Sequence, residues 1–171
     1  MSRRIGEGPP EAAEIGLDGK PIRVLARHAY EPVYSPDGQH IALLRGRFKE
    51  VTRHFPPSGR LTLSARLTDI FVRNASGAGM RRVTSTDRAA EEAPRWDPSG
   101  QRLAYTEWRP FDYGKKSAEI QEAIGFGFGR TVRTINADGT CPTTVLSGLD
   151  SMHFAAAWQP GVGREAGPIA C

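Results

Sequence analysis

The sequence predicts an all-β fold assembled from repeats, and three observations support this prediction. Three aromatic residues, Tyr34, Trp96 and Trp158, are separated by two equal intervals of 62 residues. Residues 74–77 (Asn-Ala-Ser-Gly) recur at the same interval as residues 136–139 (Asn-Ala-Asp-Gly). Between these landmarks, short runs of β-branched, aliphatic and aromatic residues alternate with turns rich in Pro and Gly. A fixed period shared by separate blocks is typical of repeat architectures.

The first full repeat predicts four short antiparallel strands. An extended segment at 32–35 runs into the turn 35–38 (Ser-Pro-Asp-Gly), which has Pro at its second position and Gly at its fourth. The run Ile-Ala-Leu-Leu at 41–44 gives the second strand. Residues 69–73 give the third strand because they are rich in β-branched and aromatic side chains, and 80–84 give the fourth.

The second repeat predicts the same four strands, at 93–97, 102–107, 131–135 and 143–147. Four short strands with a bulky aromatic near the first are the sequence form of one blade of a β-propeller. A blade usually takes about 40–45 residues, so a period of 62 leaves room for an insertion in each repeat. The predicted fold is therefore an all-β, partial β-propeller of about three four-stranded antiparallel blades with two long loop insertions.

The chain, 1–171, is expected to form one such partial propeller domain. Its parts are the two closing strands of a split blade at 13–26, a blade at 31–85, a blade at 93–148, the start of the split blade at 155–171, and loop insertions at 45–67 and 108–130. Three blades are too few to close a ring, because propellers use about 4–8. We expect either a longer propeller of which this is a part, or two copies that close a six-bladed ring.

The repeated motif resembles the TolB-like, WD40-like (PD40) propeller repeat. The resemblance rests on residues 32–42, where Pro-Val-Tyr-Ser-Pro-Asp-Gly precedes Ile-Ala, and on Asp-Ile-Phe-Val at 69–72. Tyr34 stands where the repeat has Trp, and residues 97–100 (Asp-Pro-Ser-Gly) depart from its usual turn. The positions that carry the repeat are Tyr34, Pro36, Asp37, Gly38, Trp96, Pro98, Gly100, Trp158 and Pro160.

The resemblance implies a protein of the periplasm or the extracellular space, although the chain shows no signal peptide. The family includes non-catalytic interaction proteins and propellers attached to serine peptidases. The leading hypothesis is a non-catalytic module that binds a protein or peptide. The alternative is the propeller part of a serine peptidase of the α/β-hydrolase type, in which it gates substrate access.

No motif for catalysis or for a cofactor occurs in the chain. A Gly-x-Ser-x-Gly elbow is absent, and Cys141 and Cys171 form no metal-type spacing with the histidines. We expect no enzyme activity, no cofactor and no metal. Two cysteines 30 residues apart allow a disulfide, but unpaired thiols are the favoured interpretation.

The first insertion is the candidate surface for a partner. It is basic and aromatic, with one acid, Glu50, and the proposed binding residues are Arg45, Arg47, Phe48, Lys49, Arg53 and Phe55. Arginine pairs with carboxylate and phosphate, so an acidic protein or peptide is the expected partner. The competing interpretation is a solvated loop. Nucleic acid is not the expected partner, because only the composition of this loop favours it. No membrane span is expected, because the chain has no apolar run of sufficient length.

Overall fold

The computed structural model describes residues 10–55, 59–87, 89–109, 129–149, 157–158 and 171. At Phe48, 51–55, 59–65, 129 and 148–149 it describes the backbone alone. Every regular element in the described part of the chain is a β-strand. The strands are β1 (Glu11–Ile15), β2 (Pro21–Arg27), β3 (Tyr30–Tyr34), β4 (His40–Phe55), β5 (Gly59–Asn74), β6 (Arg81–Arg82), β7 (Ala90–Trp96), β8 (Arg102–Arg109), β9 (Gly129–Asn136) and β10 (Thr143–Leu149). The described residues contain no helix that could cross a membrane.

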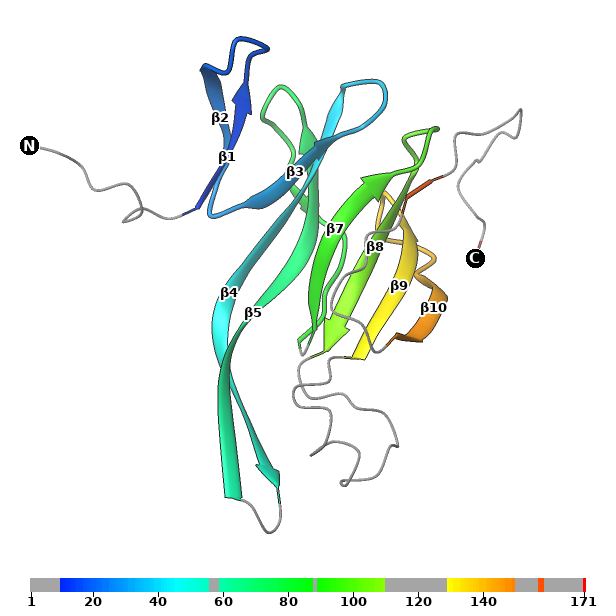
Figure 1. Ribbon diagram of the computed structural model, residues 1–171. Coiled ribbons are helices and arrows are strands. Elements are labelled where there is room, and N and C mark those ends of the chain that lie inside the picture. The colour runs from blue at the N-terminus through cyan, green and yellow to red at the C-terminus, as the bar shows by residue number, and fades with distance from the viewer. Residues whose placement is uncertain (1–9, 56–58, 88, 110–128, 150–156, 159–170) are drawn as a thin grey trace, which may run out of the picture.

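The strands form three antiparallel sheets that stand face to face in chain order (Figure 1). The first sheet contains β1 and β2, the second has the order β3-β4-β5-β6, and the third has the order β7-β8-β9-β10. Each full sheet is a meander of four neighbouring strands, as a propeller blade requires. The predicted fold class, an all-β open partial propeller, is therefore confirmed.

Equivalent turns close equivalent strands in the two full sheets. In the turn after β3 the N–H of Gly38 donates to the carbonyl of Ser35 at 2.9 Å, and after β7 Gly100 donates to Asp97 at 3.0 Å. Both glycines have positive φ, 70° and 72°. Only a residue without a Cβ adopts this conformation at little cost, which explains why Gly ends both turns.

The first sheet corresponds to the last two strands of a blade. Its turn at 16–19 has the same hydrogen bond, from the N–H of the fourth residue to the carbonyl of the first, as the turns at 74–77 and 136–139. The three N–O distances are 2.9, 2.9 and 2.8 Å, and the fourth residue is a glycine with positive φ each time. The strands β1 and β2 therefore hold the places that β5 and β6 hold in the second sheet.

The second sheet is buried on both faces, because the first and third sheets cover it. Alternate residues of a strand point to opposite faces. Ile41 and Leu43 belong to the cluster with the first sheet, and Ala42 and Leu44 to the cluster with the third. This explains why β4 begins with an unbroken apolar run and no alternation.

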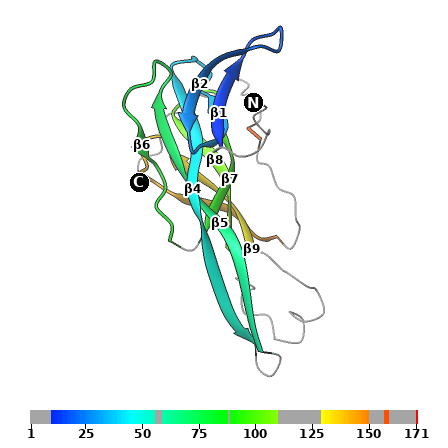
Figure 2. The ribbon, with the colours of Figure 1, turned by 90° about the vertical axis from the view of Figure 1, so that its left-hand side faces the viewer.

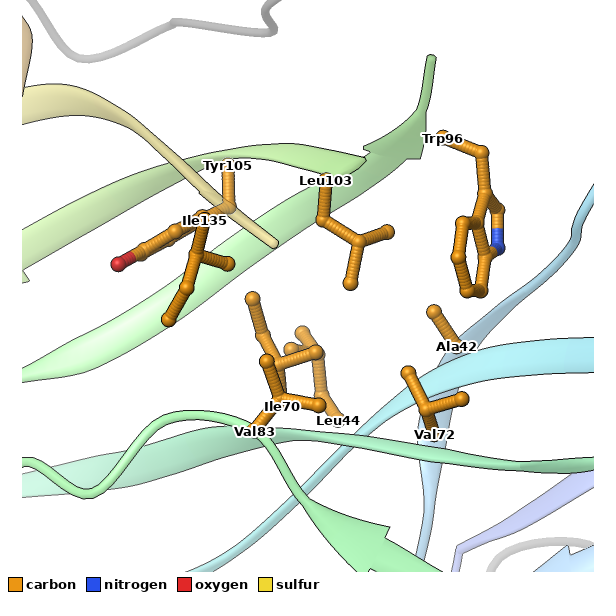
Figure 3. Close-up of a cluster of buried hydrophobic side chains, with 9 residues drawn as sticks. All are labelled: Ala42, Leu44, Ile70, Val72, Val83, Trp96, Leu103, Tyr105 and Ile135. Atoms are coloured by element: carbon orange, nitrogen blue, oxygen red, sulfur yellow. The ribbon is translucent and has the colours of Figure 1, made fainter. Parts of the chain in front are cut away.

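Figure 3 shows the cluster between the second and third sheets. The side chains from the second sheet are Ala42, Leu44, Ile70, Val72 and Val83, and those from the third are Trp96, Leu103, Tyr105 and Ile135. Nearly all of their surface is removed from water. Apolar burial of this kind is the main force that holds one blade against the next.

The tryptophans of the repeat each contact the preceding blade. The indole N–H of Trp96 donates to the carbonyl of Val33 at 3.0 Å. The indole N–H of Trp158 donates to the carbonyl of Arg95, also at 3.0 Å. The two donors are 62 residues apart, and so are the two acceptors, Val33 and Arg95. The aromatic period of the sequence is therefore also the period of contact between successive blades.

The first insertion differs from the loop that the sequence analysis expects at 45–67. Strands β4 and β5 pair without a break from His40–Asn74 to Phe55–Gly59, so that the insertion is a long β-hairpin. Figure 2 shows it as a twisted two-stranded arm that extends beyond the sheets. Residues 61–67 (Leu-Thr-Leu-Ser-Ala-Arg-Leu) alternate apolar and polar residues, which is the strand signal that the many charges obscured.

The arm leaves the blade at Gly46. A Cβ at this position would lie 1.9 Å from the carbonyl oxygen of Leu67 and 2.7 Å from the Cα of Thr68. The backbones of β4 and β5 therefore approach each other more closely here than any other residue would permit.

The two cysteines form a disulfide, which corrects the interpretation that they are unpaired thiols. Cys141 and Cys171 are bonded, with their Cα atoms 5.4 Å apart. A separation of 30 residues carries no information about distance in the fold, so the spacing could not predict this bond. The second insertion lies mostly outside the described residues, as do Pro160 and all of 155–171 except residues 157, 158 and 171.

Candidate partner-binding site

A pocket of about 460 Å³ lies at the base of the hairpin arm. Its residues are His28 before β3, Arg45, Gly46, Arg47 and Lys49 of β4, Leu67, Asp69 and Phe71 of β5, and Arg82, Thr86 and Asp87 of β6 and the loop after it. Arg45, Arg47 and Lys49 alternate along β4 and so share one face of the strand. Because Leu43 on this same face packs toward the first sheet, the pocket opens where that short sheet ends and the arm continues.

The pocket is positively charged. Four cationic side chains, those of Arg45, Arg47, Lys49 and Arg82, face two carboxylates, Asp69 and Asp87, which leaves a net charge of +2 with His28 neutral. A concave basic site concentrates the field of its charges and attracts anionic groups.

One of the two carboxylates is already satisfied inside the protein. Asp69 accepts a hydrogen bond from the Arg82 guanidinium at 2.6 Å and another from the Thr86 N–H at 3.0 Å. The remaining cations make only weak contacts with described residues. Arg45 lies over the ring of Phe71 at 5.7 Å and donates to the sulfur of Met80, while the Lys49 ammonium is 3.4 Å from the carbonyl of Asp87.

The structure thus places three of the predicted binding residues, Arg45, Arg47 and Lys49, in one pocket. The other three, Phe48, Arg53 and Phe55, lie in the arm of β4, and their side chains are outside the described part of the structure. Their role in binding remains a prediction.

The positions that carry the repeat lie in the turns and between the blades. Asp37 accepts hydrogen bonds from the Ser35 hydroxyl at 2.5 Å and from the Gln39 N–H at 3.0 Å, so it holds its own turn together. These bonds to the ionised carboxylate lower the pKa of Asp37, the Ser35 bond most. Pro36 and Pro98 stand second in the turns that Gly38 and Gly100 end.

A second cluster of charged groups lies close to the pocket, between the second and third sheets. Glu91 of β7 and Glu107 of β8 are adjacent partners in the sheet, and both are buried. Glu107 is held by the guanidinium groups of Arg109 at 2.8 Å and Arg133 at 2.5 Å.

None of the ion pairs among the described residues includes Glu91. It accepts one hydrogen bond, from the Thr86 hydroxyl at 2.8 Å, and its other oxygen has no hydrogen-bond partner in the described structure. Burial, with smaller contributions from the charges of Asp69 and Glu107, raises the pKa of Glu91 to about 8. Glu91 is therefore largely protonated at neutral pH.

Sequence reasoning missed His28, Asp69 and Arg82 as parts of the pocket. The antiparallel register of β4, β5 and β6 brings Asp69 and Arg82 beside the base of the arm. His28 comes from the connection between β2 and β3. The pairing of Arg45 with Asp69 in that register follows from the hairpin, where the sequence predicts a loop. The residues described contain no group of three or more His, Cys, Asp or Glu side chains that could hold a metal.

The stacked four-stranded meanders, joined by an aromatic contact at each repeat, define the class: a β-propeller repeat protein in open form. A curated relative is the Tol-Pal system protein TolB of Anaeromyxobacter dehalogenans, to which the chain is 35% identical over 92 residues. The matched stretch is 52% of this chain and 17% of that protein, so the chain corresponds to a small part of the relative.

A solved structure from Agrobacterium tumefaciens assigned as TolB is also similar, with a TM-score of 0.37 and 16% identity over 78% of this chain and 56% of that one. No family model matches the chain. The match to the curated TolB confirms the resemblance to the TolB-like β-propeller repeat family.

Proposed function

We propose that this chain is a non-catalytic propeller module that binds a protein or peptide partner at the base of its hairpin arm. The observation that carries the proposal is the basic pocket. Among the described residues Arg45 and Lys49 make only weak polar contacts, and Arg47 is exposed to solvent. The curated relative is by name a protein of the Tol-Pal system, which by analogy favours action through contact with other proteins.

The arm supports the same proposal. A two-stranded hairpin alone is only marginally stable in water, and beyond residue 45 the described β4 pairs with β5 alone. A partner that lies against the arm and reaches the pocket at its base would cover both. The alternative of a propeller that gates a serine peptidase gains no support from the curated match.

The experiment is selection of peptides from a displayed random library on the immobilised chain. The variant Arg45→Glu/Arg47→Glu reverses the charge of the pocket, and Lys20→Glu/Arg95→Glu makes the same change in charge at exposed positions elsewhere. We expect enrichment of acidic sequences that bind the parent and the control but not the pocket variant. Equal binding to all three proteins, or no enrichment, would contradict the proposal.

We propose further that the two ends of the array are covered in the functional assembly. Ile22 and Val24 of the first sheet are 61% and 50% exposed. At the other end Val145 is 60% exposed, although its equivalent in the second sheet, Val83, is only 7% exposed. Exposed apolar sheet faces favour association, either with further blades of a longer chain or with a second copy in a six-bladed ring.

The mass of the protein in solution tests the second of these possibilities. A two-fold dimer at micromolar concentration supports the ring, and replacement of Ile22 and Val24 by Lys is then expected to give monomers. A monomer at every concentration excludes it.

A further inference from the structure

We propose that the pocket at the base of the arm takes one carboxylate group of a peptide, flanked by an apolar side chain, and that arginines hold this carboxylate as arginines hold Glu107 on the same face of the next blade. The inference rests on the proposed function and names the chemical group that the site recognises. It is drawn from a comparison of the two blades at equivalent positions.

The residue pairs between neighbouring strands show which positions of the two full blades are equivalent. In the second sheet Arg45 pairs with Asp69 and Leu43 with Phe71, and in the third Glu107 pairs with Thr131 and Tyr105 with Arg133. These pairs differ by 62 residues throughout, like the turns and the tryptophans. Arg45, Arg47 and Phe71 are thus equivalent to Glu107, Arg109 and Arg133.

In the third sheet this position contains its own carboxylate. Glu107 is 3% exposed in its side chain and bridges Arg109 and Arg133. The chain itself therefore shows a carboxylate held between arginines on the face that a blade turns toward its predecessor. Charge-assisted bonds of this kind are among the stronger polar contacts in proteins.

In the second sheet the same position lacks the anion. Arg45 replaces the glutamate, Arg47 keeps the arginine, and Phe71 replaces the second arginine. The ion pairs among the described residues involve Lys20, Arg23, Arg27, Arg82, Arg109, Arg130 and Arg133. None of the described pairs includes Arg45, Arg47 or Lys49. These three cations can therefore bind an anionic group of a ligand.

The apolar residues that line the pocket favour an apolar side chain next to the carboxylate. Leu67 and Phe71 provide an apolar wall beside the cations, and Phe71 packs on the cluster under the first sheet. A volume of about 460 Å³ is in the range of small-ligand sites, roughly 300–1,000 Å³, and accommodates about two side chains of a peptide. An acidic residue next to an apolar one fits these walls, as does an apolar C-terminal residue with its free carboxylate.

The test uses short synthetic peptides and the whole chain labelled with ¹⁵N. The acidic probe is acetyl-Leu-Glu-Leu-amide, its control is acetyl-Leu-Gln-Leu-amide, and a third peptide, acetyl-Leu-Leu with a free C-terminus, presents the carboxylate of the main chain. Titration is followed by the amide shifts of the pocket residues, and the protein variants are Arg47→Gln and, as a control, Lys20→Gln. Arg47 is exposed and has no described side-chain contact, so we expect its replacement to leave the fold intact.

We expect the Glu peptide, the free-carboxylate peptide or both to bind with shifts at Arg45, Arg47 and Phe71, and the Gln peptide to bind about ten-fold more weakly or not at all. Arg47→Gln should weaken binding by a similar factor, and Lys20→Gln should not. Which of the two carboxylate peptides binds more tightly identifies the source of the carboxylate.

Equal affinity for the Glu and Gln peptides, shifts confined to other surfaces, or no binding by either carboxylate peptide would overturn the inference. If peptides selected from the library still require Arg45 and Arg47 in that case, the proposed function survives without the carboxylate pocket. If the library also gives no binder, both proposals fail.

Discussion

Replacement of Glu91 by Gln should make the stability of the protein less dependent on pH. The carboxyl group of Glu91 is fully buried, has a pKa of about 8 in the folded chain, and returns to about 4.5 when the chain unfolds. The folded state therefore holds a proton that the unfolded state releases. A raised carboxyl pKa costs no stability below pH 4.5, and the cost grows as the pH rises toward 8.

The size of the effect follows from the two pKa values. One pKa unit corresponds to about 1.4 kcal/mol, so the cost is about 1 kcal/mol at pH 5 and about 3 kcal/mol at pH 7. Gln cannot ionise, and its side-chain oxygen can still accept the hydrogen bond from the Thr86 hydroxyl. We expect Glu91→Gln to exceed the parent in free energy of unfolding by an amount that increases by about 2 kcal/mol between pH 5 and pH 7.

The assay is urea denaturation of the parent, Glu91→Gln and the exposed control Glu50→Gln at half-unit intervals from pH 4.5 to 8. The control should follow the parent at each pH. A constant difference between Glu91→Gln and the parent across this range would refute the reasoning, because it would mean that the carboxyl group of Glu91 is ionised in the folded protein at pH 7.

Three further changes address the contacts between and within blades. Trp96→Phe removes the indole donor to Val33 and should lower the free energy of unfolding by about 1–3 kcal/mol. An unchanged denaturation midpoint would speak against this contact. Gly46→Ala forces β4 and β5 apart and should cost about 1–3 kcal/mol, with faster amide exchange at the base of the arm; undiminished protection there would contradict the close approach. Replacing Cys141 and Cys171 by Ser should lower the free energy of unfolding by about 3–4 kcal/mol, because the cross-link no longer restricts the 30-residue loop in the unfolded chain. A mass spectrum that finds two free thiols in the native protein would disprove the bond.

Much of the fold could be predicted from the sequence because the turns of a blade need particular residues. Gly38 and Gly100 adopt positive φ, and the same residue types at the same interval imply the same backbone. The contacts of Trp96 and Trp158 with the blades before them follow from that repetition. The residue types of the turns and their repetition were sufficient to predict these features.

The pocket could be predicted only in part. The basic composition of the first insertion pointed to Arg45, Arg47 and Lys49. Composition does not show that the insertion is a strand, and only in a strand do these three alternate residues share one face. The contribution of Arg82 depends on its pairing opposite Phe71, which is a long-range contact that composition does not encode. The buried Glu91 likewise gave no signal, since charged residues are almost never fully buried and sequence position alone does not reveal an exception.

The central claim is that successive blades stack through the repeated tryptophans, and NMR of the indole groups tests it most directly. The indole proton of Trp96 should show nuclear Overhauser contacts to Val33 and its neighbours in β3, and that of Trp158 to Arg95 in β7. Contacts of both indoles with residues of their own sheet alone, or rapid exchange of both protons with water, would contradict the stacked-blade arrangement.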